Sequence, residues 1–144
     1  MRDANAARLD EIIASHSRRE GPLLPILHDI QAEFGCIDEN AKRHVAGALN
    51  LSRADVHGVV SFYHDFTAEP AGKPVLKLCR AEACKSRGVE NLVADALLAA
   101  GDRVEIETVY CLGLCSAGPN AMIGKSVHAR LDSPKLTALI KELA

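Results

Sequence analysis

Four cysteines lie in two close pairs in the second half of the chain. Cys79-Arg-Ala-Glu-Ala-Cys84 has the spacing C-x4-C, and Cys111-Leu-Gly-Leu-Cys115 has the spacing C-x3-C. A [2Fe–2S] cluster requires four thiolates, two for each iron. The spacing therefore predicts that Cys79, Cys84, Cys111 and Cys115 bind one [2Fe–2S] cluster, so that the same four residues are the metal ligands and the cofactor-binding residues.

Other uses of these cysteines remain open at this point. Structural zinc also takes four cysteines, but its ligands usually come in C-x2-C pairs, and neither spacing here is that short. Two disulfides are typical of secreted proteins, and a thioredoxin-type dithiol needs C-x-x-C, which does not occur. Cys36 belongs to neither pair and is predicted to be a buried or half-buried free thiol.

The residues around the pairs predict a β-α-β unit that brings them together. Val75 to Cys79 form an apolar strand, Val89 to Leu97 carry a helical stripe that Gly101 ends, and Val104 to Tyr110 alternate as a second strand. Strands connected in this way are parallel, with a right-handed crossover. Because each cysteine pair begins where a strand ends, both pairs should emerge at the carboxyl edge of the sheet, where open α/β structures place ligands.

The immediate surroundings of the pairs suit a buried anionic cluster. A helix beginning around Ser86 is expected to direct its N-terminal dipole towards the site. Gly113 and Gly118 leave room for the backbone to approach the sulfides, and Leu112 and Leu114 can shield the cluster from water.

Two more strands and a helix complete the second half. Residues 121–123 and 126–129 flank Gly124-Lys125, a pair that suits a two-residue hairpin turn. Ser133 as N-cap and Pro134 at the first helical position open the last helix. The order β-α-β-β-β-α suggests a small thioredoxin-like layer of sheet and helices.

The first half is predicted to be a bundle of helices. They are a weak one near residues 6–13, one over 23–34 that Gly35 ends, one after the N-cap Asp38, and one from the N-cap Ser52 through Phe66. Gly58 inside the last helix costs about 1 kcal/mol relative to alanine, which predicts close packing, most simply against a helix of the same bundle, with a partner subunit as the alternative. After a linker at residues 69–74, the fold class is α+β, with a helical bundle at 1–68 and a thioredoxin-like [2Fe–2S] domain at 73–144.

Composition argues against several classes of function. Within 144 residues the net charge is −2, aromatic residues make up 3%, and tryptophan is absent, so neither a basic surface nor a base-stacking platform for nucleic acid is expected. No segment has the roughly 20 apolar residues of a membrane span, and residues 1–20 fit neither a secretory signal nor a transit peptide. We therefore expect a cytoplasmic protein without nucleic acid and without direct membrane contact.

No catalytic residues are predicted. A G-x-G-x-x-G dinucleotide loop is missing, and none of the 6 histidines pairs with a nucleophile or with a second histidine at ligand spacing. These features predict a carrier of electrons rather than a chain with its own substrate-binding catalytic site.

The cysteine pairs and their neighbours resemble a known family. The C-x4-C run and Cys111-Leu-Gly-Leu-Cys115-Ser-Ala-Gly-Pro119 are similar to the small [2Fe–2S] subunit of NADH dehydrogenase modules, as found in NADH:quinone oxidoreductase. The resemblance extends through Leu24–Ile30 and Val56–Tyr63. It implies a thioredoxin-like ferredoxin domain with one [2Fe–2S] cluster on the four paired cysteines.

Within that family the chain looks closest to the gamma subunit of NAD-dependent formate dehydrogenase, through the runs Leu49–His57 and Phe62–Phe66. The resemblance implies a beta-type iron–sulfur partner subunit that binds FMN and NAD and, through it, a formate-oxidising catalytic subunit. The cluster of this chain would exchange single electrons with that flavin, and residues 1–68 would bind the flavin subunit. The equivalent subunits of complex I and of NAD-coupled hydrogenases remain alternatives.

A regulator of a different class also remains open. Val45–Val60 has the pattern of a helix-turn-helix, in which the cluster would act as a redox sensor. Arg53 in the supposed recognition helix is accompanied by Asp55 and Asp65, and the chain has no basic stripe, which argues against DNA binding.

Overall fold

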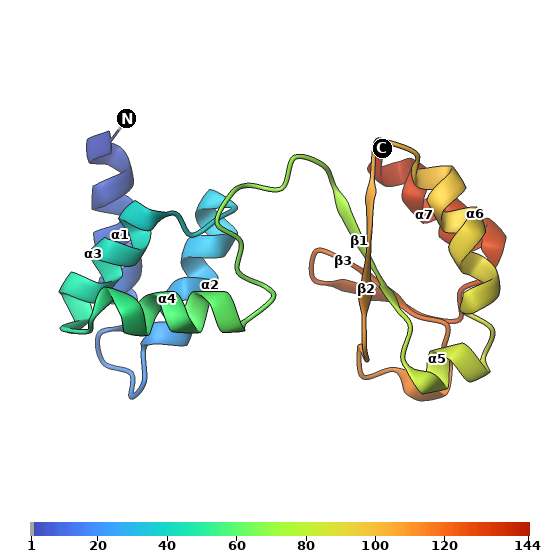
Figure 1. Cartoon of the computed structure of the whole chain (residues 1–144), viewed down its shortest axis with the longest axis horizontal. Coiled ribbons are helices and arrows are strands. Elements are labelled where there is room, and N and C mark those ends of the chain that lie inside the picture. Colours follow the sequence, from blue (N-terminus) through green and yellow to red (C-terminus); the bar gives the residue numbers. More distant parts are fainter. Residues whose placement is uncertain (1) are drawn as a thin grey trace. The chain divides into compact units, whose positions relative to one another are not determined.

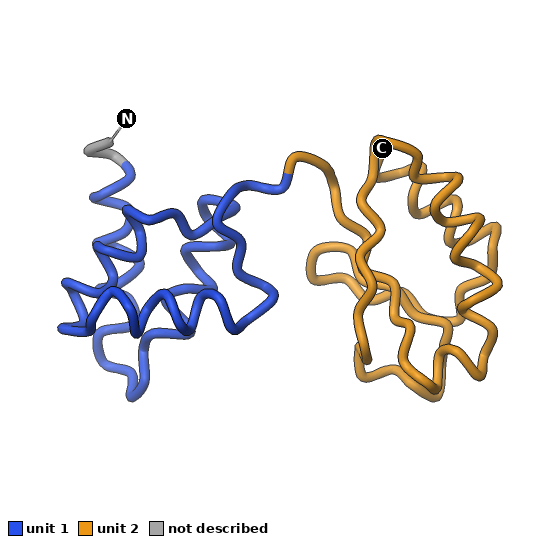
Figure 2. Tube along the Cα trace, in the orientation of Figure 1, with its two compact units in different colours: residues 1–71 blue, residues 72–144 orange. Residues whose placement is uncertain are grey.

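The computed structural model describes residues 2–144, with side chains from Asn5 onward. Figure 1 shows the order of the helices and strands, and Figure 2 shows the two compact units into which the chain divides, Met1–Ala71 and Gly72–Ala144. Unit 1 contains four helices: α1 (Arg2–His16), α2 (Leu23–Phe34), α3 (Glu39–Leu49) and α4 (Arg53–Phe62). The helical first half and the mixed second half agree with the predicted fold class.

Unit 1 has its own apolar core, centred on α2. Ile26, Leu27 and Ile30 are fully buried and pack with Val45 of α3 and Val56 of α4. Their spacing on α2 is that of one helical face, as the apolar stripe over residues 23–34 predicts. Burial of this stripe, rather than helix propensity, therefore accounts for most of the stability of these short helices.

The helix ends in unit 1 are specified locally. The left-handed backbone of Gly35, with φ of 73°, ends α2. The Asp38 carboxylate accepts the Ala41 N–H over 2.7 Å and caps α3. Ser52 and Asp55 form a capping box, in which the Ser52 hydroxyl accepts the Asp55 N–H over 3.0 Å and the Asp55 carboxylate accepts the Ser52 N–H over 3.1 Å.

Two expectations about α4 are wrong. The helix ends at Phe62 rather than Phe66, because Tyr63 adopts an extended backbone, and Phe66 packs instead on the ring of His28 with centroids 4.8 Å apart. An alanine Cβ at Gly58 would meet no atom within 4 Å, so this glycine does not mark close packing against another described helix. Gly58 instead leaves open space on the surface of α4.

Unit 2 is a four-stranded sheet with helices. Strand β1 pairs in parallel with β2, with Cys79 opposite Val109, and antiparallel with β3, which pairs with β4, giving the order β2-β1-β3-β4. The predicted parallel β-α-β unit and hairpin are confirmed. The elements are β1 (Val75–Cys79), α5 (Glu82–Ser86), α6 (Glu90–Ala100), β2 (Glu105–Val109), a short 3₁₀ helix η1 (Cys115–Ala117), β3 (Ala121–Ile123), β4 (Ser126–His128) and α7 (Ser133–Leu143).

The core of unit 2 lies between the sheet and two helices. Leu76 and Leu78 are two residues apart on β1 and therefore point to the same face of the sheet. They are buried with Ala96 of α6 and with Leu136 and Ile140 of α7. Figure 1 shows α6 and α7 side by side on one side of the sheet.

The start of α7 differs by one residue from the prediction. Asp132, not Ser133, is the N-cap, because its carboxylate accepts the Lys135 N–H over 2.9 Å. Ser133 is the first helical residue, and its hydroxyl donates to the carboxylate of Asp95 on α6.

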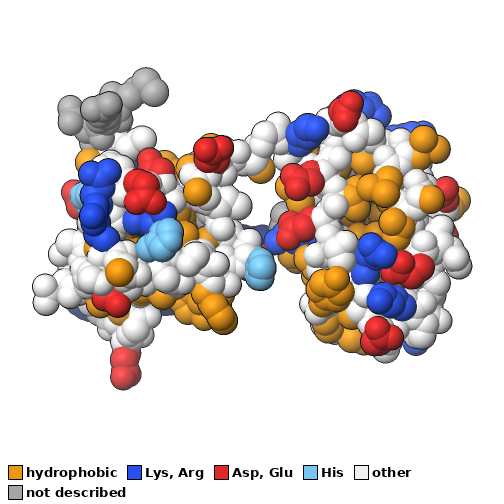
Figure 3. All heavy atoms as spheres, viewed as in Figure 1, with side chains coloured by type: hydrophobic (Ala, Val, Ile, Leu, Met, Phe, Trp, Pro, Cys, Tyr) orange, Lys and Arg blue, Asp and Glu red, His pale blue; other side chains and the backbone are white. Residues whose placement is uncertain are grey.

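The surface and the helix lengths of residues 2–144 bear on membrane and nucleic-acid binding. None of their helices is both long enough and apolar enough to cross a bilayer. On the face shown in Figure 3, basic and acidic side chains of the described residues are interspersed rather than gathered into a basic stripe. A surface of this kind offers no concentrated positive field to a phosphate backbone.

Candidate metal centre

The parallel pairing of β1 and β2 brings the two cysteine pairs to one edge of the sheet. Strand β1 ends at Cys79 and β2 ends at Val109, its partner in the register. The chain leaving β2 reaches Cys111 two residues later, and the Cys111 N–H donates to Cys79 Sγ over 3.3 Å. The Arg80 N–H, directly after β1, donates to the Val109 carbonyl over 2.9 Å. The expected meeting of the two pairs at the carboxyl edge is therefore confirmed.

Cys84 reaches the same place through α5, a short helix that the sequence pattern did not predict. Cys84 lies within α5 and is buried with Cys79 in the unit 2 core. The expected helix starting near Ser86 is wrong, because Gly88, with φ of 89°, interrupts the chain and α6 begins only at Glu90. The N-terminal dipole of such a helix therefore does not act on the site.

The loop between Cys111 and Cys115 folds around its own sulfurs. Cys111 has a φ of 97°, a left-handed backbone that is unusual for a residue with a Cβ, and Gly113 has a φ of 81°. The Gly113 N–H donates to Cys111 Sγ over 3.4 Å, and the Sγ atoms of Cys111 and Cys115 are also 3.4 Å apart. Strained backbone of this kind is common where a chain must arrange functional groups.

The two pairs differ in their exposure to solvent. Cys79 is 2% exposed and Cys84 is 1% exposed, whereas Cys111 and Cys115 are both exposed. Leu112 is half-buried and packs on the unit 2 core, while Leu114 is 38% exposed. The leucines of the loop therefore shield the site only in part.

The thiol pKa values reflect these surroundings. Burial raises the pKa of Cys79, but hydrogen bonds from the N–H groups of Ala81, Cys111 and Leu112, together with the Cys84 thiol, outweigh burial, and the pKa lies below its usual value. Burial, and then the hydrogen bond to Cys79, raise the pKa of Cys84. The lowered pKa favours the thiolate form of Cys79, which is the form that binds metal.

Two residues that follow the second cysteine pair contribute to the site: Asn120, which the sequence does not predict there, and Gly118, which it predicts only to leave room for the backbone. Asn120, which no sequence motif singles out, donates from Nδ2 to Cys84 Sγ over 3.7 Å and to the Leu114 carbonyl over 2.7 Å. A Cβ on Gly118 would stand 3.1 Å from Cys84 Sγ and 3.1 Å from Arg87 Cδ, so any larger residue there would require Cys84 or the chain at Gly118 to shift. The sequence signal available for Asn120 was a polar residue directly before the apolar strand Ala121–Ile123.

Two basic residues near Cys84 form ion pairs with carboxylates. Arg80 forms a two-pronged pair with Glu90, at 2.9 Å and 2.6 Å, and Lys85 Nζ lies 3.7 Å from Glu82. Both side chains lie at the surface, with 33% of the Arg80 side chain and 43% of the Lys85 side chain exposed.

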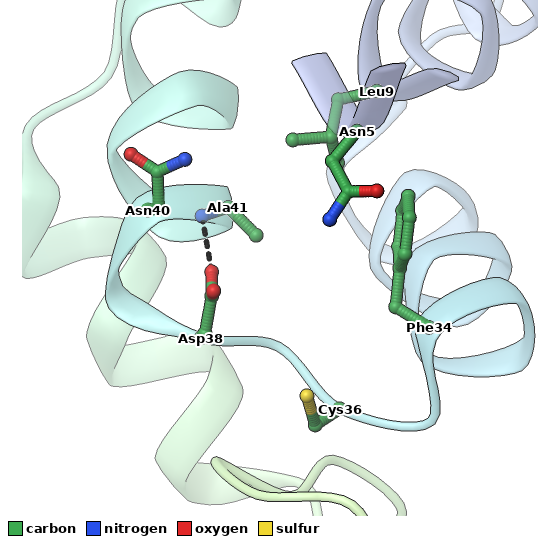
Figure 4. Close-up of a pocket in the computed structure, with 7 residues that line it drawn as sticks. All are labelled: Asn5, Leu9, Phe34, Cys36, Asp38, Asn40 and Ala41. Atoms are coloured by element: carbon green, nitrogen blue, oxygen red, sulfur yellow. Dashed lines mark hydrogen bonds between the residues drawn. The ribbon is translucent and has the colours of Figure 1, made fainter. Parts of the chain in front are cut away.

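Cys36 lies in unit 1, between α2 and α3. It is half-buried and lines a small cavity of about 190 Å³ with Phe34 and Asp38, drawn in Figure 4. Burial, followed by the negative charges of Asp38 and Glu69, raises the pKa of this thiol. The expectation of a half-buried free thiol is therefore confirmed.

The paired cysteines fit a [2Fe–2S] cluster in donor type and arrangement. Two thiolates on one tetrahedral metal with bonds of about 2.3 Å stand about 3.8 Å apart, close to the 3.4 Å between Cys111 and Cys115. The N–H groups directed at Cys79 Sγ and Cys111 Sγ suit sulfurs that carry negative charge. Among the described residues, no three His, Cys, Asp or Glu side chains are placed to hold a single metal ion.

Known proteins are similar in sequence to this chain over nearly its whole length. The family model for thioredoxin-like [2Fe–2S] ferredoxins matches residues 9–144. The NADP-reducing hydrogenase subunit HndA of Solidesulfovibrio fructosivorans is 30% identical over 141 residues, which cover 92% of this chain and 82% of that protein. An E-type subunit of NADH-quinone oxidoreductase (E 2) from Rhizobium meliloti (strain 1021) is 31% identical over 144 residues, covering 92% of this chain and 86% of that protein.

A solved structure has a similar fold over most of this chain. The crystal structure of an NAD⁺-reducing [NiFe]-hydrogenase in the air-oxidized state matches 84% of this chain with a TM-score of 0.70 and 25% identity. This chain spans only 22% of that hydrogenase chain. The matched family model covers nearly the whole sequence, and relatives at 30% and 31% identity are covered over most of their length. The chain therefore belongs to the thioredoxin-like [2Fe–2S] ferredoxin family, and its resemblance to the small [2Fe–2S] subunit of NADH:quinone oxidoreductase is confirmed.

Proposed function

We propose that this chain is an electron-transfer subunit of an NAD-linked oxidoreductase complex and that Cys79, Cys84, Cys111 and Cys115 hold its [2Fe–2S] cluster. The observation that carries the proposal is the meeting of the two cysteine pairs, with the Cys111 N–H donating to Cys79 Sγ over 3.3 Å. When bound, the cluster supplies one-electron redox chemistry. The chain itself supplies the thiolate ligands, the N–H donors to their sulfurs, and burial on the side of Cys79 and Cys84.

Metal analysis tests the ligand assignment. Anaerobically purified protein is analysed for iron, acid-labile sulfide and zinc, and its EPR spectrum is recorded after reduction with dithionite. We expect two irons and two sulfides per chain, the stoichiometry of one such cluster, and loss of the signal when any of the four paired cysteines is replaced by serine. Cys36→Ser is the matched control, because Cys36 lies in unit 1 and should leave the cluster intact. One zinc without sulfide would overturn the proposal.

The helical unit is proposed to bind the partner subunit. Its α4 region exposes large apolar side chains, with Phe62 74%, Tyr63 40% and Leu51 39% exposed. Tyr63 and Leu51 line a largely apolar groove of about 450 Å³ together with Leu23 and Leu49. Contiguous apolar surface of this kind marks protein-binding sites more often than DNA-binding sites, which supports a protein partner over the helix-turn-helix alternative.

The host complex is proposed to be a cytoplasmic NAD-dependent formate dehydrogenase. Its beta-type flavin subunit would carry FMN and NAD, and a third subunit would oxidise formate. The runs Leu49–His57 and Phe62–Phe66 support this choice, while the relatives named above support a hydrogenase or complex I as the alternatives.

Purification of the native complex distinguishes these hosts. The tagged chain is purified from its own cells, and the eluate is assayed for NAD reduction with formate and with hydrogen, and for quinone reduction with NADH. Formate-dependent activity that depends on this chain supports the proposal. Activity with hydrogen or quinone alone would assign the chain to the corresponding alternative.

A further inference from the structure

Asn120 is the one buried polar side chain among the described residues of unit 2, at 1% exposure. Its Nδ2 donates to the Leu114 carbonyl over 2.7 Å and to Cys84 Sγ over 3.7 Å. Its own backbone carbonyl accepts the Cys79 N–H over 3.0 Å. Because burial of an amide costs free energy unless it is hydrogen-bonded, the two bonds that Nδ2 donates offset part of the cost of burying this side chain.

These three contacts reach all three segments that carry the paired cysteines. Cys79 ends β1, Cys84 lies in α5, and Leu114 directly precedes Cys115 in the loop that follows β2. Asn120 itself stands directly before β3. One residue therefore connects the buried pair to the exposed pair.

The orientation of the amide follows from its partners. Nδ2 is 2.7 Å from the Leu114 carbonyl, which accepts only, so the amide oxygen cannot occupy that place. Oδ1 has no hydrogen-bond partner among the described residues. The donor end of the amide is thus the end that faces Leu114 and Cys84.

We propose that Asn120 is a positioning residue whose side-chain amide holds the Cys111–Cys115 loop against Cys84 and sets the reduction potential of the cluster through an N–H···S bond to Cys84. This inference rests on the proposed cluster and adds to it a residue that is not a ligand. Hydrogen bonds to ligand sulfurs are among the factors that determine the potential of iron–sulfur clusters. A donor to Cys84 Sγ favours the more negatively charged reduced state, so its removal lowers the potential.

The test uses the full-length chain after iron and sulfide have been measured in the wild type. Asn120→Leu keeps the approximate size and removes both donated bonds, and Asn120→Asp keeps the shape and replaces the donor by an acceptor. Asn91→Leu, at an exposed position of α6, is the matched control. The reduction potential is measured by EPR-monitored titration, and the Fe–S(Cys) stretching bands by resonance Raman spectroscopy in H₂O and D₂O.

We expect both Asn120 variants to have a lower potential than the wild type and to lose the part of the H/D shift that arises from the Cys84 bond, while Asn91→Leu changes neither. Variants that keep the wild-type far-UV circular dichroism but fail to hold iron also support a positioning role. A wild-type potential with unchanged Raman bands overturns the inference, as does unfolding of unit 2 in both variants, which would make the role structural. A wild-type chain without iron and sulfide would instead overturn the proposed function.

Discussion

The backbone N–H of Cys111 donates to Cys79 Sγ over 3.3 Å, although the two residues are 32 positions apart in the sequence. This bond exists because β1 and β2 are parallel neighbours and end together, with Cys79 opposite Val109. A shift of the register by one residue would turn the Cys79 side chain to the other face of the sheet. The site therefore depends on the pairing of the two strands that precede the cysteine pairs.

Gly118→Ala is predicted to disrupt the site. The added Cβ would lie 3.1 Å from Cys84 Sγ and 3.5 Å from Cys84 Cα, so Cys84 or the chain at Gly118 must move. Overpacking of this kind typically costs about 1–3 kcal/mol. We expect lower iron and sulfide content per chain and a lower melting temperature.

Gly72→Ala is the matched control for this substitution. A Cβ at Gly72 would meet no atom within 4 Å, and its backbone is not left-handed. Wild-type iron content in both variants would show that the space beside Cys84 tolerates a methyl group, and the steric argument would then be wrong.

Much of the site could be predicted from the sequence because it depends on short-range spacing. The two cysteine pairs, the strand before each pair and the parallel connection are all encoded within a few residues of each cysteine. The contacts of Asn120 could not be predicted in this way, because its partners Cys84 and Leu114 meet only after the sheet has formed.

The differences between expectation and structure also have local causes. The helix expected near Ser86 starts later because Gly88 adopts a left-handed backbone, and the sequence pattern does not distinguish a helical glycine from a turn glycine. The α4 helix ends four residues before Phe66, which is apolar at helical spacing yet reaches the core from a non-helical segment. An apolar residue at helical spacing is predicted to be both buried and helical, but Phe66 shows that a residue can be buried without being helical.

Leu27→Ala is predicted to destabilise the helical unit by about 2–5 kcal/mol, the usual cost of truncating a buried leucine. Leu27 is fully buried in the unit 1 core. If residues 1–68 and 73–144 fold as separate domains, which stays a prediction, the far-UV signal of the helices should melt earlier while the visible absorption of the cluster melts as in the wild type.

Leu98→Ala serves as the control, because Leu98 is 85% exposed and its truncation should leave both transitions in place. A single transition in which helices and cluster shift together in Leu27→Ala would contradict the division into independent domains.

Ser52→Ala is predicted to lower the stability of unit 1 by about 1 kcal/mol near neutral pH, through loss of the α4 N-cap. The hydrogen bonds from the Ser52 side chain and backbone hold the pKa of Asp55 below its ordinary value. Ionised Asp55 therefore contributes fully to the free energy of unfolding of unit 1 above the pKa of the unfolded carboxyl, about 3.9. This contribution is lost as the pH falls through the lower pKa of the folded state.

The melting temperatures of the wild type and Ser52→Ala should accordingly lie further apart at neutral pH than at about pH 3. Thermal melts followed by far-UV circular dichroism measure this difference. Ser61→Ala is the control, because the Ser61 hydroxyl donates to the Gly58 carbonyl within α4 and caps nothing. A gap that stays constant from neutral to acid pH would show that the Asp55 carboxylate takes no part in the cap.

Gly58→Ala is predicted to stabilise the isolated chain and to weaken its complex. Alanine in place of a helical glycine gains about 0.5–1 kcal/mol, and at Gly58 the new Cβ meets no atom within 4 Å. The same position lines an exposed groove with Phe62 and Tyr63, so a methyl group would occupy surface that the proposed partner contacts. Melting temperature and co-purification with the flavin subunit measure the two effects. Gly47→Ala on α3 also meets no atom within 4 Å and should raise stability without loss of partner, so equal co-purification of both variants would remove Gly58 from the proposed interface.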